Sequence, residues 1–163
     1  MHVALAGVAR LRALAETGLM GGASKPTLDR FVRLGRTALE IPVTAVSLVD
    51  DSCQFFASAA GLPDPDARTL PLSHSFCSHV VVSHEPLIFT DALEHPTLHD
   101  NPAIADLGVR AYAGFPITTD DGHVLGSFCA IDVQPHPWTE RELAILEDLS
   151  LAVSAEMDLI RRA

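Results

Sequence analysis

The chain opens with two stretches whose hydrophobic residues recur at helical intervals. In residues 4–19, leucine and valine return at loosely helical spacing until the breaker MGGASKP. A tighter pattern with steps of three and four follows at Leu28, Phe31, Val32, Gly35 and Leu39. This second pattern predicts a helix that is capped by Thr27 and stopped by Pro42.

The middle of the chain consists of short β-type runs separated by turn signals. The runs VTAVSLVDD and CQFFASAAG meet at Asp51-Ser52, which predicts a hairpin, and the next stretch, LPDPDARTLPL, is typical of a loop. A short strand is predicted at EPLIFTD, before a connection rich in Pro and Asp. The runs VRAYAGFPITT and HVLGSFCAID flank Asp120-Asp121-Gly122, a strong hairpin signal. These patterns predict about five strands.

The chain ends in one long amphipathic pattern. Thr139 and Glu142 have the spacing of a capping box. A single apolar stripe follows at Leu146, Leu149, Val153, Met157 and Ile160. This stripe is broad enough to serve both the sheet and a second subunit. The alternative is that its own core uses all of it.

Together these elements predict an α+β fold with a central antiparallel β-sheet of five to six strands and helices segregated around it. In this scheme residues 1–25 form an N-terminal helix and linker. Residues 26–163 form one domain that ends in the long helix.

Composition and charge narrow the classes of partner. The 163 residues are 48% hydrophobic and 20% charged, which is typical of one globular core. Eleven basic side chains against 21 acidic ones give a net charge of −10, and Lys25 is the only lysine. This excess of acidic side chains repels phosphate groups, so we expect no nucleic acid partner and no anionic membrane partner.

The cysteines and the N-terminal residues bear on location. The longest apolar run, near VALAGVA, is far shorter than the roughly 20 residues of a membrane span, and the start lacks a basic leader region. Cys53, Cys77 and Cys129 are scattered and odd in number, which suits a reducing compartment. We therefore expect a cytoplasmic protein.

The stretch SHSFCSHVVVSHEP places His74, Cys77, His79 and His84 close together, as in a zinc site or a nucleophile with its base. As a helix capped by Ser73 or Ser75, it turns His79 about 160° away from Cys77. The two side chains then cannot easily bind one ion. The plainer interpretation is that Cys77 is a buried small hydrophobe. A pocket-lining thiol and an attachment point for a chromophore remain open.

Other candidate chemistry is weak. Asp91, His95 and His99 have metal-ligand spacing, but Pro96 interrupts the helix that they would share, which favours an exposed acidic loop. The motifs GxGxxG, GxxxxGK[ST], HExxH and GxSxG are all missing from the sequence. The residues therefore indicate neither a catalytic constellation nor a metal site.

Three phrases, in this order, resemble the GAF domain, a small-molecule-sensing module of bacterial signalling proteins. They are TAVSLVDDSCQFFASAAGL, SHSFCSHVVVSHEPLIFTDALEHPTLHDNP and GVRAYAGFPITTDDGHVLGSFCAID. The similarity covers about residues 26–160. It is greatest to the subgroup at the N-terminus of sensor histidine kinases, diguanylate cyclases and serine phosphatases.

The resemblance implies terminal helices on one face of the sheet and, on the other, a cavity roofed by about residues 63–108. The side chains that it directs toward the cavity are Phe76, Cys77, Val80, Phe89, Asp91, His99, Tyr112, Phe115, Ser127 and Cys129. Strand alternation separates Tyr112 from Phe115 unless a bulge intervenes, so we expect at least one of them on the helix side.

The specialised members of the family are matched less well. The Asn-Lys-Phe-Asp-Glu signature of cyclic-nucleotide binders is absent, and Ser78 stands where bilin binders place a histidine. The free methionine sulfoxide reductases use cysteines in pocket loops, whereas Cys53 and Cys129 fall on predicted strands.

Three hypotheses follow. The first is a non-enzymatic regulatory module that binds an unidentified small ligand and signals through a homodimer or an output domain. The second is a reductase with Cys77 as nucleophile, and the third is a carrier of haem, bilin or metal. No cofactor is identified by the sequence.

Overall fold

The structure, a computed structural model, describes residues 2–163 and contains one six-stranded antiparallel sheet in the order β3-β2-β1-β6-β5-β4. The strands are β1 (Val43–Val49), β2 (Cys53–Ala60), β3 (Thr69–Pro71), β4 (Leu87–Phe89), β5 (Ala111–Thr118) and β6 (Val124–Asp132). The predicted α+β fold is confirmed, and the stretch expected to be a loop contains β3.

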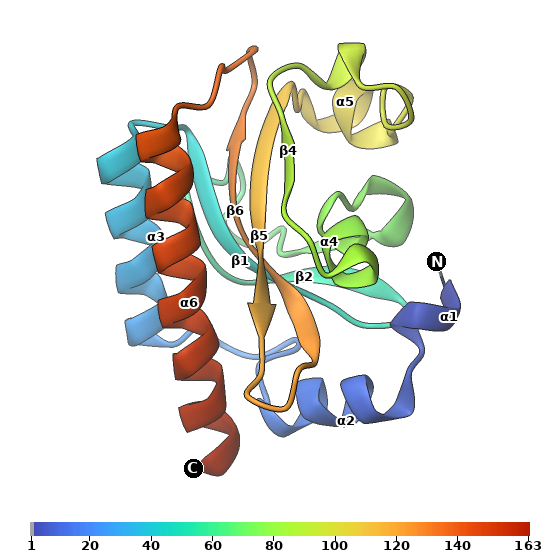
Figure 1. The fold of residues 1–163 in the computed structure, drawn as a ribbon, viewed down its shortest axis with the longest axis vertical. Helices are drawn as coiled ribbons and strands as arrows, with labels where there is room; N and C mark the ends of the chain where they lie inside the picture. Colours follow the sequence, from blue (N-terminus) through green and yellow to red (C-terminus); the bar gives the residue numbers. More distant parts are fainter. Residues whose placement is uncertain (1) are drawn as a thin grey trace.

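Helices lie on both faces of this sheet (Figure 1). The helices α3 (Pro26–Leu39) and α6 (Glu140–Arg162) pack side by side on one face. The other face is covered by η1 (Leu72–His74), α4 (Cys77–Ser83), η2 (Ala92–Glu94) and α5 (Pro102–Leu107). Among residues 2–163, no helix combines the length and the apolar character needed to cross a bilayer.

The two long helices begin and end for local reasons. The capping box of α6 is present, because Thr139 Oγ1 accepts from the backbone N–H of Glu142 and the Glu142 carboxylate accepts from that of Thr139. Helix α3 begins with Pro26 in its first turn after Lys25, rather than with Thr27 as its cap. It ends where Glu40 adopts a left-handed conformation, at φ 53°.

The main core lies between the sheet and these two helices. The predicted stripe of α6 faces this core, with Leu146, Val153 and Met157 fully buried and Leu149 7% exposed. A second, smaller cluster lies on the other face, beneath α4 and α5. Both faces of the central strands are therefore covered, and their side chains alternate between two apolar environments.

Two β-bulges interrupt this alternation. Val46 is paired with Ser58 but Ser47 is paired with Phe56, so Ala57 is an extra residue in β2. Ile117 is paired with Gly126 and Thr118 with Val124, which makes Leu125 extra in β6. The first bulge places the consecutive side chains of Ala57 and Ser58 on the helix face, and Ala59 returns to the cavity face. The second places Leu125 on the helix face, and after Gly126 the side chain of Ser127 lies on the cavity face.

The N-terminal segment is two helices rather than one. Gly7 separates α1 (His2–Leu5) from α2 (Val8–Glu16), and α1 contacts α4 on the cavity side of the sheet. The buried guanidinium of Arg10 joins this segment to the sheet. Its Nη1 donates to the carbonyls of Val49 (2.7 Å) and Val124 (3.3 Å), and its Nη2 donates to that of Leu5 (2.9 Å).

A second, exposed link ties the same segment to the last helix. Arg161 Nη2 donates to Glu16 Oε1 at 3.3 Å, which connects the end of α6 to the end of α2. Helices α1 and α2 are thus held by contacts to the sheet, to α4 and to α6.

Replacing Arg10 with Met should destabilise the fold, because three carbonyls in a buried setting lose their donor. We expect a loss of about 2–4 kcal/mol in the free energy of unfolding, measured by urea denaturation. Arg12→Met, on the exposed side of the same helix, is the matched control and should change it by less than about 0.5 kcal/mol. Equal stability of the two variants would contradict the anchoring role of Arg10.

Candidate functional site

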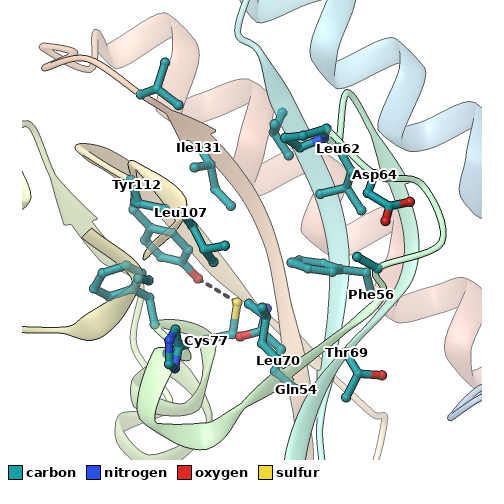
Figure 2. Close-up of a pocket in the computed structure, with 18 residues that line it drawn as sticks. Gln54, Phe56, Leu62, Asp64, Thr69, Leu70, Cys77, Leu107, Tyr112 and Ile131 are labelled. Carbon is teal, nitrogen blue, oxygen red and sulfur yellow. Dashed lines mark hydrogen bonds between the residues drawn. The ribbon is translucent and has the colours of Figure 1, made fainter. Parts of the chain in front are cut away.

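A cavity of about 250 Å³ lies between the sheet and its α4–α5 cover (Figure 2). Strands β2, β5 and β6 form its floor through Gln54, Phe56, Tyr112 and Ile131. Its remaining walls come from the loop after β2, from β3 and from the short helices. They include Leu62, Pro63, Asp64, Ala67, Thr69, Leu70, His74, Phe76, Cys77, Ala103 and Leu107.

The walls of this cavity are mainly apolar. Three aromatic rings, those of Phe56, Phe76 and Tyr112, contribute to the lining together with several leucines. The polar groups are few, and Gln54 and Cys77 lie close together in Figure 2. An apolar cavity with a few convergent polar groups is the usual form of a small-molecule site.

A cluster of hydroxyl and thiol groups lies beneath the cavity. Tyr112 Oη is 3.0 Å from Cys77 Sγ and 3.0 Å from Ser127 Oγ, and Ser127 Oγ donates to Cys77 Sγ at 3.0 Å. Ser47, paired with Ser127 across the strands, places its Oγ 3.6 Å from Cys129 Sγ. All five side chains are buried, so these groups are each other's polar partners.

This cluster changes the acidity of its members. Burial raises the pKa of the Cys77 thiol, but interactions with Cys129, Ser127, Tyr112 and Ser47 stabilise the thiolate and lower that pKa to about 7. The contact with Cys77 and burial raise the pKa of Cys129 well above its ordinary value. Burial and the nearby Cys77 charge do the same to the pKa of Tyr112. Cys77 is therefore the acidic thiol of the pair.

A second set of hydrogen bonds positions α4. Ser75 Oγ accepts from the backbone N–H of Ser78 at 3.0 Å and donates to Gln54 Oε1 at 2.5 Å. Ser75, one of the two capping candidates of the sequence, thus bonds an N–H of the first turn, although the N-cap position itself is Phe76. Because Gln54 belongs to β2, the start of α4 and the thiol of Cys77 are tied to the sheet.

Five of the ten expected cavity residues lie in the cavity wall or in the cluster beneath it. Phe76, Cys77 and Tyr112 line the cavity, while Ser127 and Cys129 lie in the polar cluster beneath it. The remaining members of the set do not line it. These are Val80, Phe89, Asp91, His99 and Phe115.

Two of these five support the cavity wall from behind. Phe89 packs on Phe76 and Tyr112, with ring centroids 5.1 Å and 5.7 Å away. Val80 is fully buried in α4, away from the lining. Their placement makes them packing residues of the roof.

Asp91 and His99 have other partners. The Asp91 carboxylate accepts two hydrogen bonds from Arg110, at 2.9 Å and 2.8 Å, and these lower the pKa of Asp91. His99 is exposed, with its Nδ1 3.0 Å from the carbonyl of His95. The spacing of Asp91, His95 and His99 does not produce a metal site, and residues 2–163 contain no group of three or more metal-ligating side chains.

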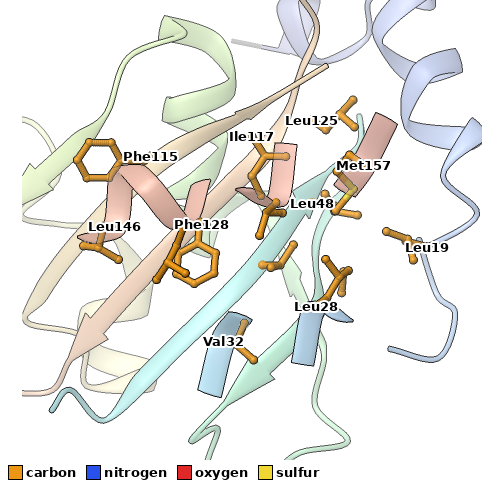
Figure 3. Packing of buried hydrophobic residues seen from close by; sticks show 14 of the residues in the cluster. Leu19, Leu28, Val32, Leu48, Phe115, Ile117, Leu125, Phe128, Leu146 and Met157 are labelled. Carbon is orange, nitrogen blue, oxygen red and sulfur yellow. The ribbon is translucent and has the colours of Figure 1, made fainter. Parts of the chain in front are cut away.

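Phe115 lies on the opposite face of the sheet. Figure 3 shows it in the core cluster near Leu146, and no bulge separates it from Tyr112 along β5. Simple alternation therefore places the two rings on opposite faces, as the sequence indicated for at least one of them. The expectation that Phe115 faces the cavity is wrong.

Several lining residues were missed by the sequence reasoning. Gln54 is a polar residue inside an otherwise apolar strand, and that contrast was an available signal. The sequence gave no comparable signal for the lining positions in the loop after β2 and in α5, because strand alternation does not place them there. His74 is another, and its Nε2 lies 2.7 Å from Asp106 Oδ2, which joins η1 to α5.

The ring of Tyr112 lies over Gly114, the next residue on the same face of β5. A Cβ at Gly114 would come within 2.3 Å of the Tyr112 hydroxyl oxygen. The absence of a side chain at this position lets the hydroxyl reach both Cys77 and Ser127. Gly114 thus determines the geometry of the polar cluster without belonging to it.

Removing the Tyr112 hydroxyl should make the Cys77 thiol less acidic. We expect the pKa of Cys77 to rise by about one unit in Tyr112→Phe, since one hydrogen bond to the thiolate is lost. The measurement is the pH dependence of thiolate ultraviolet absorbance, with Cys77→Ser as the blank. Gly114→Ala should shift the curve in the same direction, and Phe89→Leu, which removes no polar group, should leave it in place. An unshifted curve for Tyr112→Phe would contradict the assigned contact.

Comparison with known proteins gives a consistent picture. The sequence profile of the GAF domain matches residues 25–157. A cyclic di-GMP phosphodiesterase of Pseudomonas aeruginosa is 30% identical over 148 residues, which are 90% of this chain and 25% of the relative. The chain therefore spans a quarter of the length of that curated relative.

Solved structures share the fold. The GAF domain of a phosphoenolpyruvate-protein phosphotransferase from Coxiella burnetii has a TM-score of 0.70 at 21% identity, covering 94% of this chain and 95% of that one. A free methionine-R-sulfoxide reductase from Neisseria meningitidis has a TM-score of 0.66 at 16% identity, covering 94% and 90%. The PixJ GAF domain of Thermosynechococcus elongatus has 0.63 at 20%, covering 96% and 94%. At these identities the likeness concerns the fold alone.

Proposed function

The chain belongs to the GAF domain family, and from this membership we propose that it is a non-enzymatic regulatory module whose cavity binds a small, largely apolar ligand. The observation that carries the proposal is the cavity of about 250 Å³, with aromatic and aliphatic walls and few polar groups. Its volume is slightly below the roughly 300–1,000 Å³ of sites for drug-sized molecules. The ligand is therefore small, with one polar group to meet the Gln54 amide.

The groups that contact Cys77 include no histidine or carboxylate base, which argues against enzymatic turnover at this thiol. Its polar partners are the hydroxyls of Tyr112 and Ser127 and the thiol of Cys129. Nucleophilic mechanisms usually begin with a histidine or carboxylate base beside the thiol. If the protein were instead a reductase of free methionine sulfoxide, the purified chain would turn over that substrate and Cys77→Ala would not; we expect no turnover from either.

A signal leaves the cavity only if the ligand has different affinities for two arrangements of the elements around it. The roof segments contact the ligand space, and the floor strands β5 and β6 also pack against α6. We propose that α6 passes the occupied state to a second copy of the chain or to an output domain. The phosphodiesterase relative, with three-quarters of its length outside the match, supports an enzymatic output.

Cavity binding is tested with indole, a small aromatic probe that has a single N–H donor. We expect saturation-transfer NMR to detect its binding to the unaltered chain. Ala103→Phe fills the cavity from α5 and should weaken binding at least tenfold, whereas Ala105→Phe changes an exposed position of the same helix and should not. Circular dichroism checks that both variants fold. Equal binding by the two variants, or no binding by the unaltered chain, would count against the proposal.

The dimer is tested by light scattering. The outer side of α6 exposes Leu151 and Leu159 by 61% and 62%, opposite the stripe that its own core uses. We expect a mass of twice the 17.4 kDa chain, and a single-chain mass after Leu151→Glu combined with Leu159→Glu. Leu93→Glu, at an exposed position of η2, is the control and should leave the dimer intact. A single-chain mass for the unaltered protein at high concentration excludes the dimer.

A further inference from the structure

We propose that Cys77 and Cys129 form a redox pair that a small hydroperoxide, entering through the cavity, converts to an intramolecular disulfide. The proposal concerns a modification site and does not depend on the binding of a regulatory ligand. It requires only that the oxidant reach the Cys77 sulfur.

The Cys77 sulfur is reached through the cavity. Cys77 is 1% exposed, yet its side chain lines the cavity, so a reagent in bulk water meets it only by way of that space. The walls around it are apolar, with Phe56, Phe76 and Leu70 among them. A compact alkyl hydroperoxide is chemically matched to such walls, because its alkyl group is apolar and its O–O–H end is polar.

The contacts of the Cys77 sulfur favour its nucleophilic thiolate form. The thiolate is the nucleophilic form of cysteine, and neighbouring hydroxyl donors favour it. Ser127 and Tyr112 both lie 3.0 Å from Cys77 Sγ, and the pKa of Cys77 is lowered to about 7. The thiolate of Cys77 is therefore favoured over that of Cys129, whose pKa is raised.

Cys129 supplies the second sulfur of the disulfide. Ser127 and Cys129 stand two residues apart on the same face of β6, and Ser127 Oγ touches Cys77 Sγ. Ser127 is paired with Ser47, whose Oγ lies 3.6 Å from Cys129 Sγ, so the two sulfurs contact neighbouring hydroxyls of one cluster. Their interaction lowers the pKa of Cys77 and raises that of Cys129. One sulfur is therefore poised as the attacking thiolate, and the other remains a protonated thiol beside it.

The oxidation of the two thiols takes place in two steps. The Cys77 thiolate attacks the terminal oxygen of the hydroperoxide, the O–O bond breaks, and the released alkoxide takes a proton to give the alcohol. The sulfur of Cys129 then attacks the sulfur of the Cys77 sulfenic acid, an S–S bond forms, the S–O bond breaks, and hydroxide leaves with the Cys129 proton as water. Overall, two thiols and one hydroperoxide give one disulfide, one alcohol and one water.

Cys53 provides an internal comparison. It is half-buried, does not line the cavity, and its pKa is raised by burial and by the nearby Asp50 carboxylate. The same chain thus contains a less acidic thiol outside the cavity. The proposal requires that this thiol stay reduced while the other two are consumed.

The experiment treats the reduced chain with one equivalent of tert-butyl hydroperoxide near neutral pH, then counts thiols and maps peptides by mass spectrometry. We expect two thiols to be lost per chain, a Cys77–Cys129 cross-link, and reduced Cys53. Cys129→Ser should lose one thiol and give a dimedone adduct at Cys77, and Cys77→Ser should react at least tenfold more slowly. Peptide mapping of the unaltered chain decides the matter even if a variant fails to fold.

Two further arms identify the oxidant and its route. Hydrogen peroxide at the same concentration should react more slowly than the alkyl hydroperoxide if the apolar walls select the reagent. Ala103→Phe should slow oxidation of Cys77 and Ala105→Phe should not. Oxidation of Cys53 first, a disulfide between two chains, or equal rates for the unaltered chain and Cys77→Ser would overturn the proposal. Failure of indole to bind would leave these results unaffected, so the two proposals fail separately.

Discussion

The pairing of β1 with β6 at the centre of the sheet is the contact on which every other feature depends. These two strands are hydrogen-bonded from Val43 opposite Ile131 to Leu48 opposite Gly126, and their side chains are buried on both faces. At Gly126 the approach is closest, since a Cβ there would lie 1.8 Å from the carbonyl oxygen of Ser47. A side chain at this position would separate the strands that support both the core and the cavity floor.

The two faces of this central pair differ in side-chain size, and that difference separates the apolar core from the polar cluster. Toward α3 and α6 the strands present residues such as Leu48 and Phe128, which fill the space completely. Toward the roof they present small residues at Ala45, Ser47, Ser127 and Cys129. The roof segments are short helices and loops, which cannot follow the sheet closely. Beneath α4, the small residues bring the hydroxyl and thiol groups of the polar cluster together. The cavity itself lies where the cover is irregular, over Gln54, Phe56, Tyr112 and Ile131.

Much of this arrangement follows from the sequence because it depends on local periodicity. Alternation and helical spacing located the long helices and both hairpins, and they separated Tyr112 from Phe115. The bulges at Ala57 and Leu125 were not predictable, because an extra residue in a strand leaves the hydrophobic pattern almost unchanged. The lining of the cavity by the loop after β2 depends equally on contacts between distant parts of the chain.

The anchoring of Arg10 has a mechanical consequence. Its guanidinium binds the carbonyls of Val49 and Val124, which terminate or begin the same two strands that carry Ser47 and Ser127. The other end of its helix is bonded to Arg161 of α6. A rotation of α6 would therefore act through Arg161, Glu16 and α2 on Arg10, at the end of the β1–β6 pair. Arg10 and Arg161 thus join helices from both ends of the chain to the strand pair that carries the polar cluster.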